Sequence, residues 1–323
     1  MDLAQTIANE ASVGLGSVDP VKAPRIPTSG AARFVAMSLW TGARVPFRSC
    51  VSPTLASRLD ERLAAGTLEL PFPPTATGQV LALCRRDDVD MGALTRAVAS
   101  DPSLAAHFLR LSNTAVFAAR APILSLQHAV TRLGTRMVGQ VVLLITCHGR
   151  AFHVRGREAT AREMLEHAVV TAVFAQEIAR ARGECTDEAF MCGLLHDIGA
   201  PAVLQLISDL ETESGTKFDD ESVAQNIARL HEGVGFQIAS LWSTPSTVCE
   251  SIGSHHRVLS PFDRSPTALA VATIQLADAM ADGVAMEVLV AHPAAPLLNL
   301  RSDDLEGLEK ARKTAAELVA SLG

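Results

Sequence analysis

Apolar residues recur along most of the chain with the spacing of amphipathic helices. Leu55, Leu59 and Leu63, for example, lie four residues apart and share one helix face. No segment alternates apolar and polar residues for long enough to predict a strand. We therefore expect an all-α fold, a multi-helical bundle. The predicted helices cover residues 76–84, 90–99, 103–111, 137–145, 161–182, 187–196, 203–210, 221–241, 245–256, 266–282 and 303–321.

Proline, glycine and a capping aspartate set several of these boundaries. The proline-rich run at 70–74 cannot lie inside a helix. Asp101 is a good N-cap, and Pro102 suits the first helical position after it. Gly134 interrupts the helical pattern before residues 137–145, which are nearly all apolar and are therefore expected to form a buried helix.

Changes in composition divide the chain into four parts. Residues 1–52 carry many Gly and Pro with weak periodicity, which indicates a loosely ordered extension. Residues 149–162 are rich in Gly and charged side chains, and we place the start of a second helical half there. Residues 210–220 are expected to form a polar loop. The predicted helical parts are 53–150, 151–300 and a C-terminal helix over 301–323.

Composition and charge narrow the class of protein. Aromatic residues make up 4% of the chain and Tyr is absent, which favours helices over strands. The formal net charge is −7 and no Lys/Arg cluster is larger than a pair, so nucleic-acid binding is not expected.

The cysteines and the N-terminus bear on localisation. Six cysteines are scattered without a C-x-x-C motif, which is typical of reduced thiols in a cytosolic protein. The N-terminus lacks the pattern of a signal peptide. The longest apolar run, 141–147, is too short to span a membrane. We expect a cytoplasmic protein with no membrane partner.

Histidine and aspartate recur through the second half in a series that suits metal binding. Imidazole and carboxylate groups are the usual ligands of Zn, Mn and Fe. Asp278 lies in an apolar core helix, and a buried carboxylate needs a cation, an arginine or a helix N-terminus as partner. Asp197 lies close to Leu194 and Leu195, so it also needs such a partner, and it is placed to bridge two cations. The alternative is a polar cluster that has lost its metal. The series is His167, His196, Asp197, His231, His255, His256 and Asp278.

The order His, His-Asp, Asp resembles the HD superfamily of metal phosphohydrolases. Three further segments, 101–104, 109–113 and 241–245, resemble the HDOD domain, the HD-related output domain, and the match spans about residues 68–280. The resemblance implies an all-helical protein with an HD-like core preceded by a smaller helical subdomain. It also implies a regulatory or interaction module of bacterial signalling proteins.

The resemblance also implies ligand roles. His167, His196, Asp197 and Asp278 match the core HD ligands. The remaining histidines match those that bind a second metal in the HD-GYP branch, whose members hydrolyse cyclic di-GMP; they are His231, His255 and His256. The implied cofactors are therefore two divalent ions such as Fe or Mn.

Glu163 is a further candidate ligand. It lies one turn before His167, and so on the same helix face. It is similar to a carboxylate that holds a third metal in some HD-GYP proteins. The alternative is a solvated glutamate paired with Arg162 or Arg180.

Two departures from the HD-GYP pattern leave enzymatic activity open. The lysine expected after the His-Asp motif is replaced by Ala200-Pro201, and the Gly-Tyr-Pro loop is missing. Arg257 either supplies the lost positive charge or is an ordinary helix-terminal arginine. The first hypothesis is a regulatory module that binds a signalling protein in trans. The alternative is a metal-dependent phosphodiesterase acting on a nucleotide or cyclic dinucleotide; no residue is assigned as catalytic.

Overall fold

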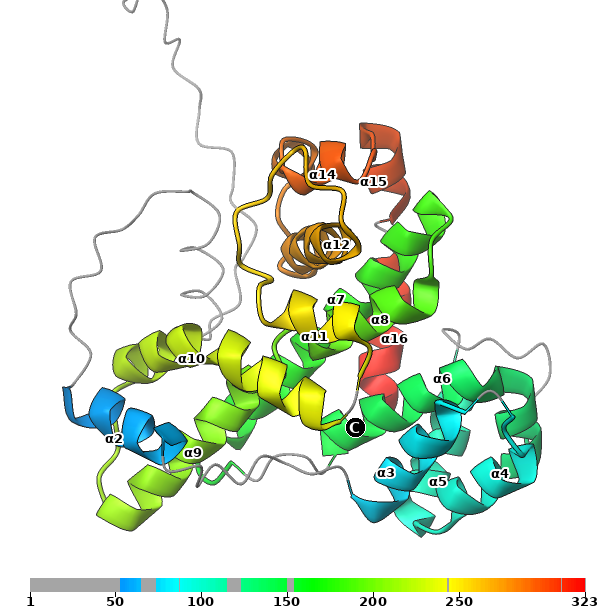
Figure 1. Ribbon diagram of the computed structural model, residues 1–323, viewed down its shortest axis with the longest axis horizontal. Coiled ribbons are helices and arrows are strands. Elements are labelled where there is room, and N and C mark those ends of the chain that lie inside the picture. Colours follow the sequence, from blue (N-terminus) through cyan, green and yellow to red (C-terminus); the bar gives the residue numbers. More distant parts are fainter. Residues whose placement is uncertain are drawn as a thin grey trace, which may run out of the picture.

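The computed structural model describes residues 53–64, 74–86, 88–114, 123–149, 154–242, 244–308 and 310–322. These residues form helices joined by turns and short loops, and none of them lies in a strand (Figure 1), so the prediction of an all-α fold is confirmed. The N-terminal extension predicted over 1–52 lies outside the described residues. The helices are α2 Pro53–Ala64, α3 Thr75–Cys84, α4 Met91–Ala99, α5 Pro102–Ser112, α6 Leu126–Gly149, α7 Glu158–Arg182, α8 Thr186–Leu195, α9 Gly199–Ser214, α10 Asp220–Leu241, α11 Ser246–Ile252, α12 Pro266–Ala281, α13 Met286–Val290, α14 Ala294–Leu297, α15 Ser302–Leu308 and α16 Ala311–Leu322.

Helices α3 to α6 pack together at one end of the molecule (Figure 1). The Asp101 side chain accepts hydrogen bonds from the N–H groups of Ser103 and Leu104, and Pro102 begins α5, as predicted. Gly134, with φ 72° and ψ 168°, interrupts α6, because few residues other than glycine adopt this conformation. The apolar run that follows, 141–145, is buried.

Helix α7 is central to the second half. It packs against α8 and α12, while α9 packs along α10, and α11 contacts both α10 and α12. The C-terminal helix α16 contacts α7 as well as α5 and α6 and therefore connects the two helical groups (Figure 1).

Three predicted segments differ from the structure. The helix expected over 245–256 ends at Ile252, and residues 253–256 form turns. The polar loop expected over 210–220 is helical as far as Ser214, because Glu211 is buried in an ion pair with Arg157 rather than exposed. The single C-terminal helix expected over 303–321 is two helices, α15 and α16. Gly307, a poor helix former, lies in the last turn of α15.

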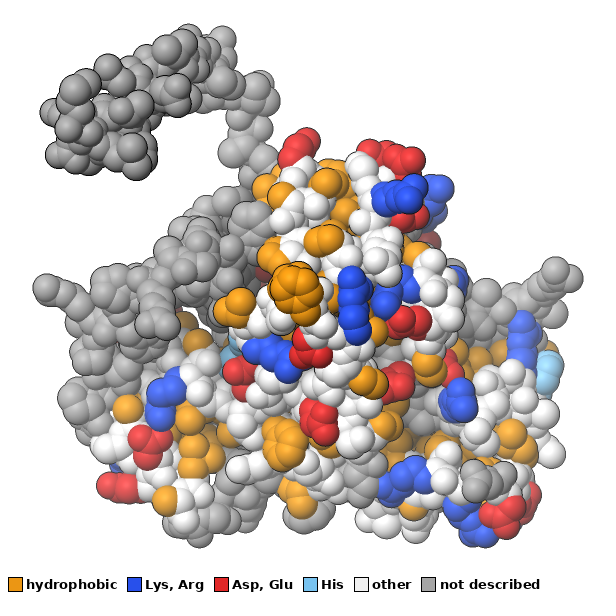
Figure 2. Space-filling model, turned by 45° about the horizontal axis from the view of Figure 1, so that its top comes forward, with side chains coloured by type: hydrophobic (Ala, Val, Ile, Leu, Met, Phe, Trp, Pro, Cys, Tyr) orange, Lys and Arg blue, Asp and Glu red, His pale blue; other side chains and the backbone are white. Residues whose placement is uncertain are grey.

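Two described stretches, Leu126–Cys147 and Thr186–Ser214, are apolar and long enough to span a membrane. In their most apolar windows, 61% and 83% of the residues are buried inside the protein. Both stretches therefore behave as core helices, whose hydropathy follows from packing in the interior. On the face drawn in Figure 2, acidic, basic and apolar side chains are interspersed.

Candidate metal centre

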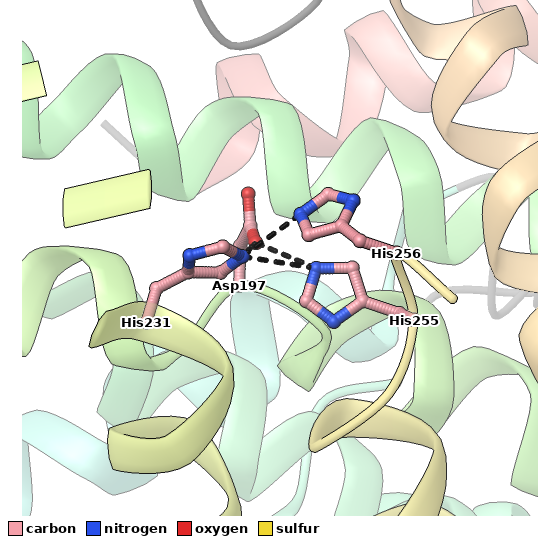
Figure 3. Close-up of side chains that lie close together, drawn as sticks. All are labelled: Asp197, His231, His255 and His256. Atoms are coloured by element: carbon pink, nitrogen blue, oxygen red, sulfur yellow. Dashed lines mark hydrogen bonds and ion pairs between the residues drawn. The ribbon is translucent and has the colours of Figure 1, made fainter. Parts of the chain in front are cut away.

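The structure brings seven of the eight predicted ligands together in two groups. The first comprises His167 of α7, His196 at the end of α8 and Asp278 of α12. The second comprises Asp197, His231 of α10 and the adjacent histidines after α11, His255 and His256 (Figure 3). Within each group, one donor atom from every residue lies within 4.8 Å of all the others.

Two glycines allow the helices that carry these ligands to approach closely. A Cβ atom at Gly193 would lie 2.6 Å from Cα of Ala172, so only glycine lets α8 pack this tightly on α7. A Cβ atom at Gly199 would overlap the carbonyl oxygen of His231. These contacts place the His196-Asp197 corner against both α7 and α10.

Three buried histidines are oriented by the same kind of hydrogen bond, from Nδ1 to a backbone carbonyl. The Nδ1–H of His196 donates to the carbonyl of Gly193 at 2.8 Å. His231 and His255 donate in the same way to Ile227 at 3.0 Å and Ile252 at 2.7 Å. A histidine that donates from Nδ1 presents the lone pair of Nε2 on its other side, which is the arrangement typical of metal-binding histidines.

The Nε2 atoms of these histidines and of His256 converge on one region. Nε2 of His231 lies 3.3 Å from Nε2 of His255 and 2.9 Å from Nε2 of His256. Nε2 of His196 is buried and has no hydrogen-bond partner among the described residues. His231 and His255 both donate from Nδ1, so their neutral rings direct Nε2 lone pairs at each other, which is unfavourable unless a cation lies between them. The donor set therefore fits a metal ion.

Asp197 lies between the two groups. Its Oδ1 is 3.2 Å from Nε2 of His255 and 3.5 Å from Nε2 of His231. Its Oδ2 faces the other way and is 3.5 Å from Nε2 of His196. One carboxylate oxygen therefore faces each group, which is the geometry needed to bridge two cations.

A carboxylate that was not predicted from the sequence, Asp282, lies beside the first group. Nε2 of His167 is 2.7 Å from Oδ1 of Asp278, and its Nδ1 is 3.6 Å from Oδ1 of Asp282. Asp282 is the C-cap of α12, four residues after Asp278, and this spacing was the signal available in the sequence. Glu163 is exposed and lies outside both groups.

The carboxylates respond differently to burial. Burial by itself raises the pKa of Asp197 and of Asp278. Neighbouring histidines, His196 for Asp197 and His167 followed by His196 for Asp278, outweigh this and hold each pKa well below its usual range. Burial and the charge of Asp278 raise the pKa of Asp282 to about 6. At neutral pH the two central carboxylates are therefore anionic.

The pKa values of two histidines shift in opposite directions. Burial lowers the pKa of His196, but the charges of Asp197 and Asp278 raise it to about 9 overall. Burial and the neighbouring His255 lower the pKa of His256 to about 3. The proton on His196 neutralises carboxylate charge, a role that a metal ion would take over when bound.

The fold and the site together define an all-helical protein with the ligand order of the HD superfamily. Within it, the model of the HDOD domain matches residues 70–258, which is more than half of the chain. The chain belongs to the HDOD family.

Solved structures share the fold at low sequence identity. A candidate metal-dependent phosphohydrolase from Shewanella amazonensis is 17% identical with a TM-score of 0.66, over 84% of this chain and 98% of that one. A candidate signal transduction protein from Marinobacter aquaeolei is 21% identical with a TM-score of 0.58, over 90% and 66%. At these identities the likeness concerns the fold alone.

One curated relative also matches. It is an uncharacterized protein of Treponema pallidum, 23% identical over 241 residues. The match covers 71% of this chain and 46% of that protein, so this chain spans about half the length of the relative.

Proposed function

We propose that this chain is a signal-transduction module of HDOD type that holds two divalent cations and acts by binding another signalling protein in trans. The observation that carries the metal centre is the position of Asp197, with one oxygen directed at each ligand group. His167, His196 and Asp278 would hold one ion. His231, His255 and His256 would hold the other, with Asp197 shared between the two.

The donor types favour particular metals. The second group offers three imidazole nitrogens and one carboxylate, and the first offers two imidazoles and a carboxylate, with Asp282 nearby. Mixed imidazole and carboxylate sites suit Fe, Mn and Zn better than Mg or Ca. Two divalent ions against Asp197, Asp278 and Asp282 leave a net charge of about +1 when the histidines are neutral.

The residues around the centre favour metal binding without hydrolysis of a phosphoester substrate. Ala200 occupies the position where the HD-GYP pattern has a lysine, and it is buried. Arg257 follows the paired histidines, but its guanidinium lies 3.5 Å from Asp263 and is partly neutralised by it. A phosphoester substrate therefore lacks the cation that the HD-GYP pattern provides at this point of the chain.

Two apolar side chains follow the paired histidines and are almost fully exposed. Val258 is 95% exposed and Phe262 is 92% exposed, both in the loop between α11 and α12. Exposed apolar side chains next to a ligand site are candidates for contact with a partner protein. The loop joins a metal-ligand turn to α12, so this surface is connected to the metal centre through the chain.

The regulatory proposal is tested by capturing partners from the source cell with metal-loaded protein as bait. Phe262→Ser is expected to lose the specific partner. Leu124→Ser changes an equally exposed apolar residue in the other half and serves as the matched control. The same partner bound equally by Phe262→Ser and wild type would contradict the loop surface, and no signalling protein bound by wild type would contradict the regulatory role.

A second candidate function is phosphoester hydrolysis, which the bridging position of Asp197 favours. Two bound cations polarise a phosphoryl oxygen and lower the pKa of a water molecule. The test is hydrolysis of a generic phosphodiester and of cyclic dinucleotides with Mn, Fe or Ni, comparing wild type with Asp197→Ala. Turnover that the substitution abolishes would establish the enzyme. No turnover with any metal, or equal turnover in the variant, would exclude it.

A further inference from the structure

The two adjacent histidines of the second group lie on a turn rather than on a helix. Helix α11 ends at Ile252, and residues 253–256 form turns before the loop to α12. Local hydrogen bonds of a turn fix a backbone less firmly than a helix does. The positions of His255 and His256 therefore depend on contacts from other elements.

Two side chains from neighbouring helices bind the backbone of this turn. The Gln275 amide of α12 donates to the carbonyl of His255 at 2.7 Å and to that of Arg257 at 2.8 Å. Both amide hydrogens are thereby used. The Glu232 carboxylate of α10 accepts a hydrogen bond from the backbone N–H of His256 at 3.0 Å. The turn is thus bound to one helix through its carbonyls and to the other through an N–H.

Each of these side chains lies next to a metal-ligand candidate on its own helix. Gln275 is three residues before Asp278 on α12, and Glu232 directly follows His231 on α10. The carboxylate of Glu232 also lies 3.8 Å from Nδ1 of His255. The hydrogen bonds therefore link the turn to α10 and α12, two of the helices that carry the other candidate ligands.

We propose that Gln275 and Glu232 are positioning residues that hold His255 and His256 in place to bind the second metal. This proposal rests on the two-metal centre proposed above. Neither side chain is a ligand in this arrangement, because the groups that face the turn are engaged with its backbone. Residues of this kind, which orient ligands without touching the metal, commonly change metal affinity about 10–100-fold when replaced.

The test is a Co²⁺ titration of metal-free protein, followed by the visible absorption of the bound ion and by calorimetry. His256→Ala and His167→Ala identify which binding event belongs to which group. In Gln275→Met, which keeps the side-chain length but removes both donors, Co²⁺ affinity of the second group should fall about 10–100-fold. Affinity of the first group should stay within about twofold of wild type.

Glu232 offers a second and more conservative pair of variants. Its side chain is one-third exposed, so replacement should leave the fold intact. Glu232→Met should weaken the second group, whereas Glu232→Gln keeps an oxygen that can accept from His256 and should restore most of the affinity. Gln225→Met on α10, a half-buried glutamine whose amide contacts Glu221, is the matched control and should bind like wild type.

Amide hydrogen exchange of the metal-free proteins gives an independent readout. Exchange at His256 should speed up in Glu232→Met and Gln275→Met but not in Gln225→Met. Equal weakening of both Co²⁺ events, or no weakening of either, would overturn the positioning role while leaving the metal centre intact. Wild-type protein that takes up no Co²⁺ would overturn the metal centre itself, and the positioning role with it.

Discussion

The rings of His196, His231 and His255 are each held from behind by a backbone carbonyl of the preceding helical turn. This arrangement needs no other side chain, because each histidine lies three or four residues after its acceptor. It fixes the orientation of each ring and the direction of Nε2 before any ion arrives. Metal binding at such a site does not require the rings to be reoriented, which favours affinity.

The division into two groups predicts that single substitutions remove single ions. His256→Ala should reduce Mn²⁺ uptake from two ions per chain to one, and His167→Ala should also leave one, in the other group. Elemental analysis after dialysis against Mn²⁺ measures this directly. Glu163→Gln, an exposed neighbour of the first group, should bind like wild type. Loss of both ions from either histidine variant would contradict two separable positions.

Residue chemistry predicted the side chains that gather in the two groups but not the side chains that contact the turn beside them. Asp278 was identifiable because a carboxylate in an apolar helix needs a partner, and it lies 2.7 Å from His167. Gln275 and Glu232 hydrogen-bond to a turn, and the spacing of apolar residues in the sequence does not predict where that turn lies. Asp282 was overlooked although it follows Asp278 by one turn. Glu163 shares that spacing with His167, yet it faces solvent.

Among the helices, close contacts at glycine, where no larger side chain would fit, determine where the candidate ligands lie. Gly193→Ala places a methyl group 2.6 Å from Cα of Ala172, and backbone atoms cannot easily move aside. We expect a loss of about 1–3 kcal/mol in the free energy of unfolding, the usual cost of overpacking. Chemical denaturation measures the loss.

A second glycine provides the control for this substitution. Nothing lies within 4 Å of a Cβ atom at Gly233, which is inside α10. Gly233→Ala should therefore stabilise the protein by about 0.5–1 kcal/mol through higher helix propensity. If both variants were equally destabilised, close packing would not be the reason for glycine at Gly193.

The buried carboxylate of Glu211 on α9 stabilises the contact with Arg157 at the start of α7. Burial raises the pKa of Glu211, but hydrogen bonds from Arg157, Lys217 and the Phe218 N–H lower it to about 2. A carboxyl group with a lowered folded-state pKa stabilises the fold above its ordinary pKa of 4.5. That contribution is lost as the pH falls towards 2.

Glu211→Gln should therefore cost about 1–3 kcal/mol at pH 7, where Arg157 and Lys217 lose the charge of the Glu211 carboxylate. The difference between wild type and variant should shrink as the pH falls from 4.5 to 2. Urea denaturation at several pH values measures both. A difference that stays constant across this range would show that the ionised carboxylate is not the stabilising form.

Most helices could be predicted from periodicity, because their apolar faces are the ones buried against α7 and its neighbours. The extension of α9 beyond Leu210 could not, since polar residues such as Glu211 look like loop until their partner Arg157 is known. The short helices α13 and α14, over 286–297, also escaped prediction. Helices of four or five residues carry too few positions for a periodic pattern.

At the scale of the whole molecule, the ligands come from helices far apart in the sequence. His167 and Asp278 are separated by 111 positions and meet only in the folded protein. Ions that bind the folded but not the unfolded chain stabilise it by mass action, by about 2.7 kcal/mol for each site at 100 times its dissociation constant.

Adding metal should therefore raise the melting temperature of wild-type protein, and removing it with a chelator should lower that temperature again. His256→Ala should keep about half of that stabilisation, because one ligand group remains. Calorimetry with and without Mn²⁺ measures the effect. A melting temperature unchanged by metal in wild type would mean that neither group binds the ion appreciably tighter than the unfolded chain does.

In the proposed centre, Asp197 bridges two metal ions, one in each ligand group. Elemental analysis of freshly purified wild-type and Asp197→Asn protein, each reloaded with Mn²⁺ or Fe²⁺ and then desalted, tests it most directly. We predict two ions per chain in wild type, one for each group, and at most one in the variant. Wild-type protein that retains no ion, or Asp197→Asn that retains two, would contradict the bridged centre.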